Sequence, residues 1–303
     1  MRSRLSPDAY HRICGIALGL LAMIIVTGGA VRLTGSGLGC SDWPTCEQDQ
    51  FVPEANFHGW IEFGNRLLTV IVSVAVILAV LGSMARNPRR SDLVRLSWGL
   101  VAGVVAQIVL GGIVVLSHLN PWLVLGHFAL SMVLVGNAVV LRHRSGDHLR
   151  AARPSVPVPS EQLRSMATAI TLFSVAVLTT GTFVTGSGPH AGSRDDPIPR
   201  LPFRPSDIAR VHGTTVVLFL VMVAALALAV RRDPTGERLR PRMQALGAVV
   251  VLQAGIGWTQ YFTGVPELLV GLHLAGATAL WATVVSLWLE TQEHVPVPEG
   301  APA

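Results

Sequence analysis

The chain has 303 residues, half of them hydrophobic and only 14% charged. A soluble domain carries about a quarter of charged residues, so this composition excludes a soluble globular protein and predicts an integral membrane protein. The net charge of +5 comes from 23 basic residues, all of them arginine, which lie in short clusters between apolar runs. Because no basic patch with interleaved aromatic residues is present, the pattern excludes a nucleic-acid partner.

Eight apolar runs follow one another along the chain, each close to the roughly 20 residues that cross a bilayer core. Backbone groups in lipid must be bonded within their own segment, so these runs predict eight transmembrane helices and an all-α fold. The first run lacks a small-residue cleavage site and more spans follow it, so we interpret it as a helix and not as a signal peptide. The predicted spans are 13–31, 59–82, 97–117, 122–141, 166–186, 211–230, 243–263 and 266–289.

The arginines orient these helices in the membrane. Seventeen of the 23 fall on one side, in the segments before span 1 and after spans 2, 4 and 6, and the other side has six. Cytoplasmic segments are the arginine-rich ones in multi-pass membrane proteins. We therefore predict that both termini are cytoplasmic and that the loop 32–57, with two of the three cysteines, is extracytoplasmic.

An internal repeat divides the chain into two halves. The tetrapeptide TGSG at 34–37 recurs at 185–188, and His58 and His212 each open the second span of their half. Each half crosses the membrane an even number of times, so the repeat predicts two pseudo-symmetric four-helix bundles of the same orientation, 1–150 and 151–290. The Pro-rich tail 291–303 is predicted to be disordered. Four further residues of the first half recur 146 positions later in the second half: Gln107, Gly111, His127 and Ala129 recur as Gln253, Gly257, His273 and Ala275.

Four of the ten histidines lie near the extracytoplasmic ends of predicted helices: His58, His127, His212 and His273. Ionisable groups inside a membrane are costly and often functional, although each ring could simply make one interhelical hydrogen bond. Two per half, at one depth, favour a further role. One imidazole from each of two helices can hold a haem, which predicts two haem sites. Zinc is less favoured, because no cysteine or carboxylate accompanies these histidines at the usual spacing.

The two halves differ in their charges. In HGWIEFGNR (58–66), His58, Glu62 and Asn65 share one helix face and Arg66 lies at its edge. The matching VHGTTVVLF keeps His212 and has no charged residue. Two interpretations stay open: Glu62 and Arg66 merely neutralise each other, or Glu62 handles protons or stabilises charge beside one haem. On the second interpretation the first half is a reaction site and the second a plain cofactor site.

Cys40 and Cys46 lie in GSGLGCSDWPTC (35–46), on the side predicted to be oxidising, where thiols tend to pair. A structural disulfide that braces the loop and a redox-active pair are both open interpretations. Cys14 is predicted to be a small packing residue. Arg32 and Arg210, at helix ends, either contact haem propionates or extend to the membrane interface.

Together these motifs resemble the heme A synthase family. The resemblance is carried by GGAVRLTGSGLGCSDWPTC, HGWIEFGNR, LGHFALS, RVHGTT and GLHLAGA, and it extends from about residue 13 to 289. It implies a plasma-membrane oxidoreductase that converts the C8 methyl group of heme O into the formyl group of heme A for terminal oxidases. An electron-transfer cytochrome b and a haem-binding or haem-transport protein are the alternatives.

The resemblance also implies roles for single residues. His212 and His273 would ligate the iron of a permanent haem b, His58 and His127 would flank the heme O site, and Glu62 would be the essential carboxylate. Cys40 and Cys46 correspond to a cysteine pair in the family's first outer loop. Further partners that it implies are heme O synthase, an electron or thiol donor, the lipid bilayer and a second copy of the chain.

Two positions depart from the family pattern. Some members carry a histidine where this chain has Asn65, and asparagine is a poor substitute for an imidazole ligand. His58, two turns earlier on the same face, is the available replacement. Some members have a second cysteine pair between spans 5 and 6, which this chain lacks, so any redox work by cysteines must fall to Cys40 and Cys46.

Overall fold

The computed structural model describes residues 5–47, 50–151, 157–193 and 197–292 of the chain, and its regular elements there are helices. Eight of these helices are long and apolar enough to cross a membrane, which confirms the predicted all-α membrane fold. The residues 293–303 of the predicted tail lie outside the described ranges. The elements are α1 (Pro7–Leu33), α2 (Phe57–Ala85), α3 (Ser91–Leu116), α4 (Pro121–Ser145), α5 (Asp147–Ala151), α6 (Glu161–Ser187), α7 (Pro205–Arg232), the 3₁₀ helix η1 (Pro234–Leu239), α8 (Arg240–Phe262) and α9 (Glu267–Thr291).

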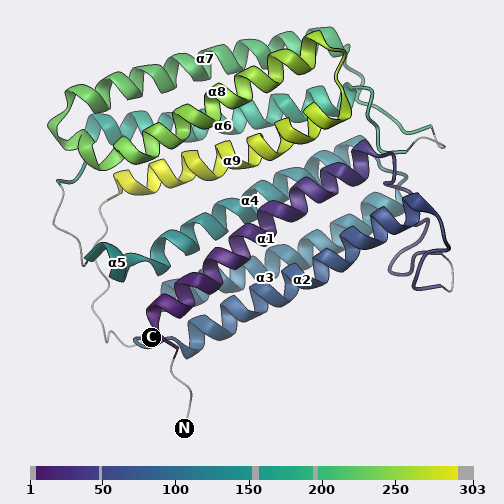
Figure 1. The fold of residues 1–303 in the computed structure, drawn as a ribbon, viewed down its shortest axis with the longest axis horizontal. Helices are drawn as coiled ribbons and strands as arrows, with labels where there is room; N and C mark the ends of the chain where they lie inside the picture. Colours follow the sequence, from purple (N-terminus) through teal and green to yellow (C-terminus); the bar gives the residue numbers. More distant parts are fainter. Residues whose placement is uncertain (1–4, 48–49, 152–156, 194–196, 293–303) are drawn as a thin grey trace.

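The long helices form two four-helix bundles, α1–α4 and α6–α9, which lie side by side (Figure 1). In the first bundle α1 and α3 both pack on α2 and on α4, so α2 and α4 are diagonal to each other. In the second bundle α6 and α8 flank α7 and α9 in the same way, although α7 and α8 touch only slightly. α1, α4 and α9 form most of the contact between the bundles. One end of the molecule carries the loop with Cys40 and Cys46, and we call it the cysteine end.

Several helices begin earlier than the apolar runs predict. α1 begins at Pro7 after Ser6, whose Oγ accepts a hydrogen bond from the Ala9 N–H. α7 begins at Pro205, so His212 lies two turns inside the helix and not at its start. A capped first turn with proline and an acidic residue is stable helix without being apolar. Hydropathy alone therefore misses these turns.

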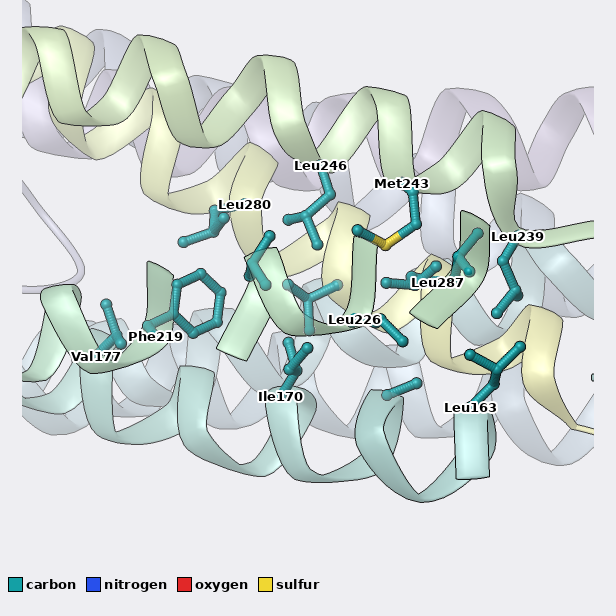
Figure 2. Packing of buried hydrophobic residues seen from close by; sticks show 14 residues of the cluster. Leu163, Ile170, Val177, Phe219, Leu226, Leu239, Met243, Leu246, Leu280 and Leu287 are labelled. Carbon is teal, nitrogen blue, oxygen red and sulfur yellow. The ribbon is translucent and has the colours of Figure 1, made fainter. Parts of the chain in front are cut away.

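A continuous apolar core runs through the second bundle (Figure 2). Its residues repeat at intervals of seven on α6, α7 and α9, a spacing that keeps them on one face of each helix. They are Leu163, Ile170 and Val177 on α6, Phe219 and Leu226 on α7, and Leu280 and Leu287 on α9. The first bundle has an equivalent core that includes Cys14, which is buried and free, as a packing residue should be.

A third apolar cluster joins the two bundles, built from α1, α4 and α9. Across it, Trp281 donates its indole N–H to the Met132 carbonyl at 2.7 Å. Lipid offers helices little hydrophobic incentive to associate, so close packing through small residues supplies much of the attraction. Gly29 of α1 is such a residue, since a Cβ there would overlap the Leu274 side chain of α9.

We therefore expect Gly29→Leu to destabilise the contact between the bundles. Overpacking a tight contact costs about 1–3 kcal/mol, which thermal unfolding in detergent would report as a lower midpoint. Gly19→Leu is the matched control, because it lies on the same helix and a Cβ there meets nothing within 4 Å. Equal midpoints for both variants would contradict the packing role of Gly29.

The 146-residue repeat is visible in the short hairpins α3–α4 and α8–α9. His118 and Leu119 both have positive φ, and the equivalent Gly264 and Val265 do too. The Leu119 N–H donates to the Val114 carbonyl at 2.9 Å, and the Val265 N–H donates to the Gln260 carbonyl at 2.8 Å. These matching turns confirm the pseudo-symmetry that the sequence predicts.

Candidate functional site

All four singled-out histidines lie in the first two turns of helices that begin at the cysteine end. His58 is on α2 and His127 on α4, the diagonal pair of the first bundle. His212 is on α7 and His273 on α9, the diagonal pair of the second bundle. All four rings are half-buried. In each bundle the two histidine-bearing helices lie diagonally opposite each other, with the other two helices between them.

Hydroxyl groups hold the rings on α2 and α7. The Nδ1 atom of His58 lies 2.8 Å from the Ser36 Oγ, and the Nδ1 of His212 lies 3.0 Å from the Thr180 Oγ1. A hydroxyl partner on Nδ1 leaves Nε2 as the nitrogen that can face a ligand. Gly181 of α6 makes room for the His212 ring, because a Cβ there would lie 3.2 Å from its Cε1.

The rings on α4 and α9 are placed differently, by glutamine and glycine. Gln107 and Gln253 each donate from Nε2 to the backbone carbonyl of His127 and His273, respectively, at 3.0 Å. Gly111 and Gly257 lie against the Cε1 atoms of these two rings. The sequence repeat thus marks two similar histidine settings, which differ in that the Ser131 hydroxyl also donates to the His127 carbonyl.

The surroundings of the four histidine rings fit the binding of haem iron. The Nδ1 atoms of His127 and His273 are buried and have no hydrogen-bond partner among the described residues. A buried unpaired ring nitrogen costs free energy unless the ring has another role. Half-buried imidazoles on diagonal helices, with glycines at their edges, fit axial ligation of a haem in each bundle. In contrast, no group of three or more possible metal ligands of the His, Cys, Asp and Glu types occurs within the described ranges.

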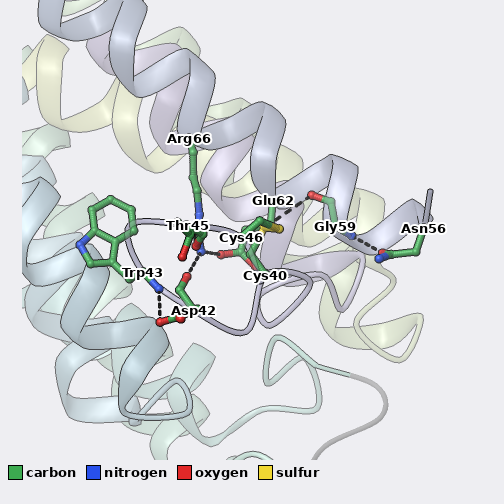
Figure 3. Close-up of a disulfide and its surroundings, with 9 residues drawn as sticks. All are labelled: Cys40, Asp42, Trp43, Thr45, Cys46, Asn56, Gly59, Glu62 and Arg66. Atoms are coloured by element: carbon green, nitrogen blue, oxygen red, sulfur yellow. Dashed lines mark hydrogen bonds and ion pairs between the residues drawn. A yellow bond between two sulfur atoms is a disulfide. The ribbon is translucent and has the colours of Figure 1, made fainter. Parts of the chain in front are cut away.

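Glu62 points toward the cysteine loop (Figure 3). Its side chain is 8% exposed, and its Oε2 accepts a hydrogen bond from the Cys40 N–H at 2.8 Å. Its Oε1 forms an ion pair with the Arg66 Nη2 at 2.6 Å. Glu62 and Arg66 therefore form an ion pair, as the first interpretation of their charges expects. The carboxylate is also tied to the loop backbone, which the sequence does not reveal.

Cys40 and Cys46 form a disulfide, and the loop that it closes wraps around Arg66 (Figure 3). The Arg66 guanidinium donates to the carbonyls of Asp42 and Thr45 at 3.1 and 2.9 Å. The Trp43 ring lies 5.2 Å from that guanidinium, a cation–π distance. The ring also fills the space above Gly112 of α3. The loop therefore contacts both α2 and α3 beside Glu62.

The predicted face of α2 is turned toward α1 and the loop that follows it. Asn65 accepts a hydrogen bond from the Thr27 hydroxyl of α1 at 2.8 Å. This contact lies on the same face of α2 as the contacts that His58 and Glu62 make with the loop after α1. In the second bundle, Thr214 and Thr215 follow His212 and donate only to carbonyls of their own helix. The asymmetry of charge between the halves is thus also an asymmetry of loop contacts.

A segment of the loop between α6 and α7 crosses from one bundle to the other at the cysteine end. The Gly37 N–H donates to the Gly192 carbonyl at 2.7 Å, and His190 Nε2 lies 2.8 Å from the Val265 carbonyl. Arg32, predicted to meet a propionate or the interface, donates to the carbonyls of Thr185 and His190. We call residues 188–193 the strap, because they hold the first bundle's loop against the second bundle.

The chain is similar in sequence to proteins of a known family. The sequence pattern of COX15-CtaA, described as cytochrome oxidase assembly protein, matches residues 11–57 and 52–197. These ranges cover more than half of the chain. The chain belongs to the heme A synthase family, COX15-CtaA. The family match contains His58, Glu62, His127 and the cysteine pair.

Curated relatives of the family extend the match. The heme A synthase of Symbiobacterium thermophilum is 28% identical over 281 residues, which cover 88% of this chain and 90% of that protein. The heme A synthases of Geobacillus kaustophilus and Geobacillus thermodenitrificans are 32% and 31% identical over 126 and 106 residues. The chain aligns with only 39% and 33% of the length of those two family members.

The sequence alone does not predict the hydroxyl groups that contact His58 and His212. Ser36 and Thr180 are ordinary residues in their motifs, and only the fold brings them to His58 and His212. The recurrence of TGSG was the available signal, because it marks Ser36 as one of two related positions. It does not predict which of the two serines reaches a histidine.

Proposed function

We propose that this protein is a heme A synthase, which oxidises the C8 methyl group of heme O to the formyl group of heme A. The proposal is carried by one observation: two matched pairs of histidines on diagonal helices, of which only the first has a buried carboxylate close to it in the chain. Two similar haem sites, one with a polar group for chemistry, suit an enzyme that keeps one haem and transforms another.

His212 and His273 would hold a permanent haem b in the second bundle, residues 151–290. When bound, that haem would supply one-electron redox chemistry. The residues of this bundle contribute positioning: Thr180 orients the His212 ring, and Gln253 fixes the turn of α9 that carries His273.

The first bundle, residues 1–150, would bind heme O as substrate between His58 and His127. Two successive hydroxylations of the methyl group would give a hydrated aldehyde, which loses water to leave the formyl group. The overall change is a four-electron oxidation that inserts one oxygen atom, so the oxygen and an oxidant that takes up the electrons must both come from outside the chain. Glu62 would accept or release protons or stabilise charge in these steps. Its bonds to Arg66 and to the Cys40 N–H hold the carboxylate in one place while it does so.

The proposed setting is the plasma membrane, with both termini in the cytoplasm and the cysteine end outside. The unequal distribution of arginines supports this orientation. Heme O synthase, an electron or thiol donor and a second copy of the chain remain proposed partners.

Glu62→Gln tests the reaction assigned to the first bundle. Glutamine can still accept from the Cys40 N–H but carries no charge for Arg66 and no proton for transfer. We expect a loss of heme A formation of about 100-fold or more, in line with the effect of removing a general acid or base. The measurement is extraction and chromatography of haem from membranes of cells that also make heme O.

The same extracts distinguish the alternatives. The variant should keep haem b, because Glu62 lies outside the second bundle. Glu161→Gln is the matched control, since Glu161 is an exposed residue in the first turn of α6. If the unaltered protein binds two haems and forms no heme A, it is an electron-transfer cytochrome or a haem carrier and not a synthase.

A further inference from the structure

A chain of hydroxyl groups leads away from His58. The Ser36 Oγ lies 2.8 Å from the His58 Nδ1 and also 2.8 Å from the Thr34 Oγ1. The Thr34 hydroxyl in turn donates to the Ala30 carbonyl at 2.9 Å, at the last turn of α1. Ser36 is completely buried, so water does not compete for these bonds.

The direction of the hydrogen bonds follows from counting protons. A hydroxyl has one proton to donate and can accept through its lone pairs. The Thr34 hydroxyl lies within hydrogen-bond distance of two backbone carbonyls, that of Ala30 at 2.9 Å and that of Val31 at 3.1 Å, and both can only accept. With the Thr34 proton on one of them, Ser36 donates to Thr34. Because the proton of Ser36 is then used, Ser36 can only accept from His58, whose Nδ1 must carry the hydrogen.

We propose that Ser36 and Thr34 are positioning residues that fix His58 in the Nδ1–H tautomer and thereby present its Nε2 lone pair to the iron of heme O. This inference rests on the proposed function for the identity of the ligand. The tautomer itself follows from the hydrogen bonds. In metal sites, a hydrogen bond from the second ring nitrogen fixes both the tautomer and the orientation of the ligand.

The second TGSG, at 185–188, does not form an equivalent chain of hydroxyl groups in the second bundle. Thr185 repeats the bond of Thr34 by donating to the Gly181 carbonyl at 3.1 Å. The next link is missing, because the Ser187 Oγ is buried and has no hydrogen-bond partner within the described ranges. His212 instead contacts Thr180, which lies within α6 and donates to the Ala176 carbonyl.

The two ligand positions therefore differ in what holds them. Thr180 is part of a long helix, whereas Ser36 lies in the loop after α1 and forms an antiparallel bridge with Ser193 of the strap. A ligand whose ring is oriented by a helix residue suits a haem that stays. A ligand whose ring is oriented by a loop residue suits a haem that must arrive as substrate and leave as product, because loops open more easily than packed helices.

The test is the nitrogen-15 NMR spectrum of histidine-labelled protein purified from cells that make no heme O. We expect the His58 ring to show a protonated Nδ1 and a bare Nε2, with the signals assigned by their loss in His58→Gln. In Thr34→Val, which keeps the side-chain shape, Ser36 is free to donate to Nδ1, so the spectrum should change to the Nε2–H form. Ser36→Ala should lose the single Nδ1–H pattern.

Binding of added heme O is the second readout. Ser36→Ala and Thr34→Val should each weaken binding about 10- to 100-fold, the usual effect of losing a group that orients a ligand. Ser36→Thr, which keeps a hydroxyl, should restore affinity if it folds. Ser187→Ala is the matched control: it removes the equivalent buried hydroxyl of the repeat and should change neither the His58 spectrum nor the affinity.

The outcomes separate this inference from the proposed function. Unchanged His58 spectra in both Thr34→Val and Ser36→Ala would overturn the hydroxyl chain, even if the protein makes heme A. The expected spectra without any heme A formed by the unaltered protein would leave the tautomer established and overturn the synthase. Weakened binding with an unchanged spectrum would also overturn the inference, because a merely structural effect would then explain it.

Discussion

Replacing His273 with alanine is expected to abolish haem b binding and to leave heme O binding in place. His273 lies on α9, diagonal to α7 with His212, and its buried Nδ1 has no partner among the described residues. Changing a group that only orients a ligand weakens metal binding about 10- to 100-fold, so removing the ligand itself should cost at least that much. His212→Ala should have the same effect.

The measurement is the Soret absorbance of purified protein together with the haem extracted from it. His148→Ala is the matched control, because that ring pairs with Asp8 at the far end of the molecule from the cysteine loop. His127→Ala should show the reverse pattern, with haem b retained and added heme O no longer bound. Haem b lost in His127→Ala and kept in His273→Ala would reverse the roles assigned to the two bundles.

Much of the fold could be predicted because it depends on patterns within short stretches. Eight apolar runs give eight helices, and residues recurring at 146 positions adopt the same structure, as the Gln107 and Gln253 contacts show. Hydropathy does not predict the polar first turns of α1 and α7, because it registers neither the Ser6 cap of α1 nor the proline and acidic residue that begin both helices. η1 and α5 are likewise short polar helices between the spans.

The candidate site was predictable only as a set of residue types. His58, Glu62 and Asn65 were expected on one face, and all three do contact α1 or its loop. What they contact could not be predicted, because each bond joins positions 22 to 38 residues apart. Arg32 shows the same limit: it could be placed at a helix end, but its contacts with Thr185 and His190 depend on how the two bundles pack.

Replacing both Cys40 and Cys46 with serine is expected to abolish most heme A formation while haem b remains bound. The disulfide closes a ring whose backbone binds the charged groups of the proposed reaction site: the Cys40 N–H donates to Glu62, and the carbonyls of Asp42 and Thr45 accept from Arg66. Closing so short a ring restricts the unfolded chain by about 2 kcal/mol. That is enough to hold a loop but not enough for its loss to unfold eight packed helices. The second bundle manages without cysteines, so its haem should be unaffected.

The two interpretations of the cysteine pair differ in what happens to the sulfurs during turnover. If the disulfide braces Glu62, both cysteines stay oxidised while heme A is formed, and alkylation followed by mass spectrometry finds no free thiol there. If the pair exchanges electrons, the same trapping finds reduced Cys40 and Cys46 in proportion to turnover. The contacts of Glu62 and Arg66 with the ring favour bracing.

Trp43→Ala provides the matched comparison, because it removes the contacts with Arg66 and Gly112 and keeps both sulfurs. On the bracing interpretation it should lower heme A formation as well, whereas a purely redox role predicts that Trp43→Ala retains full activity.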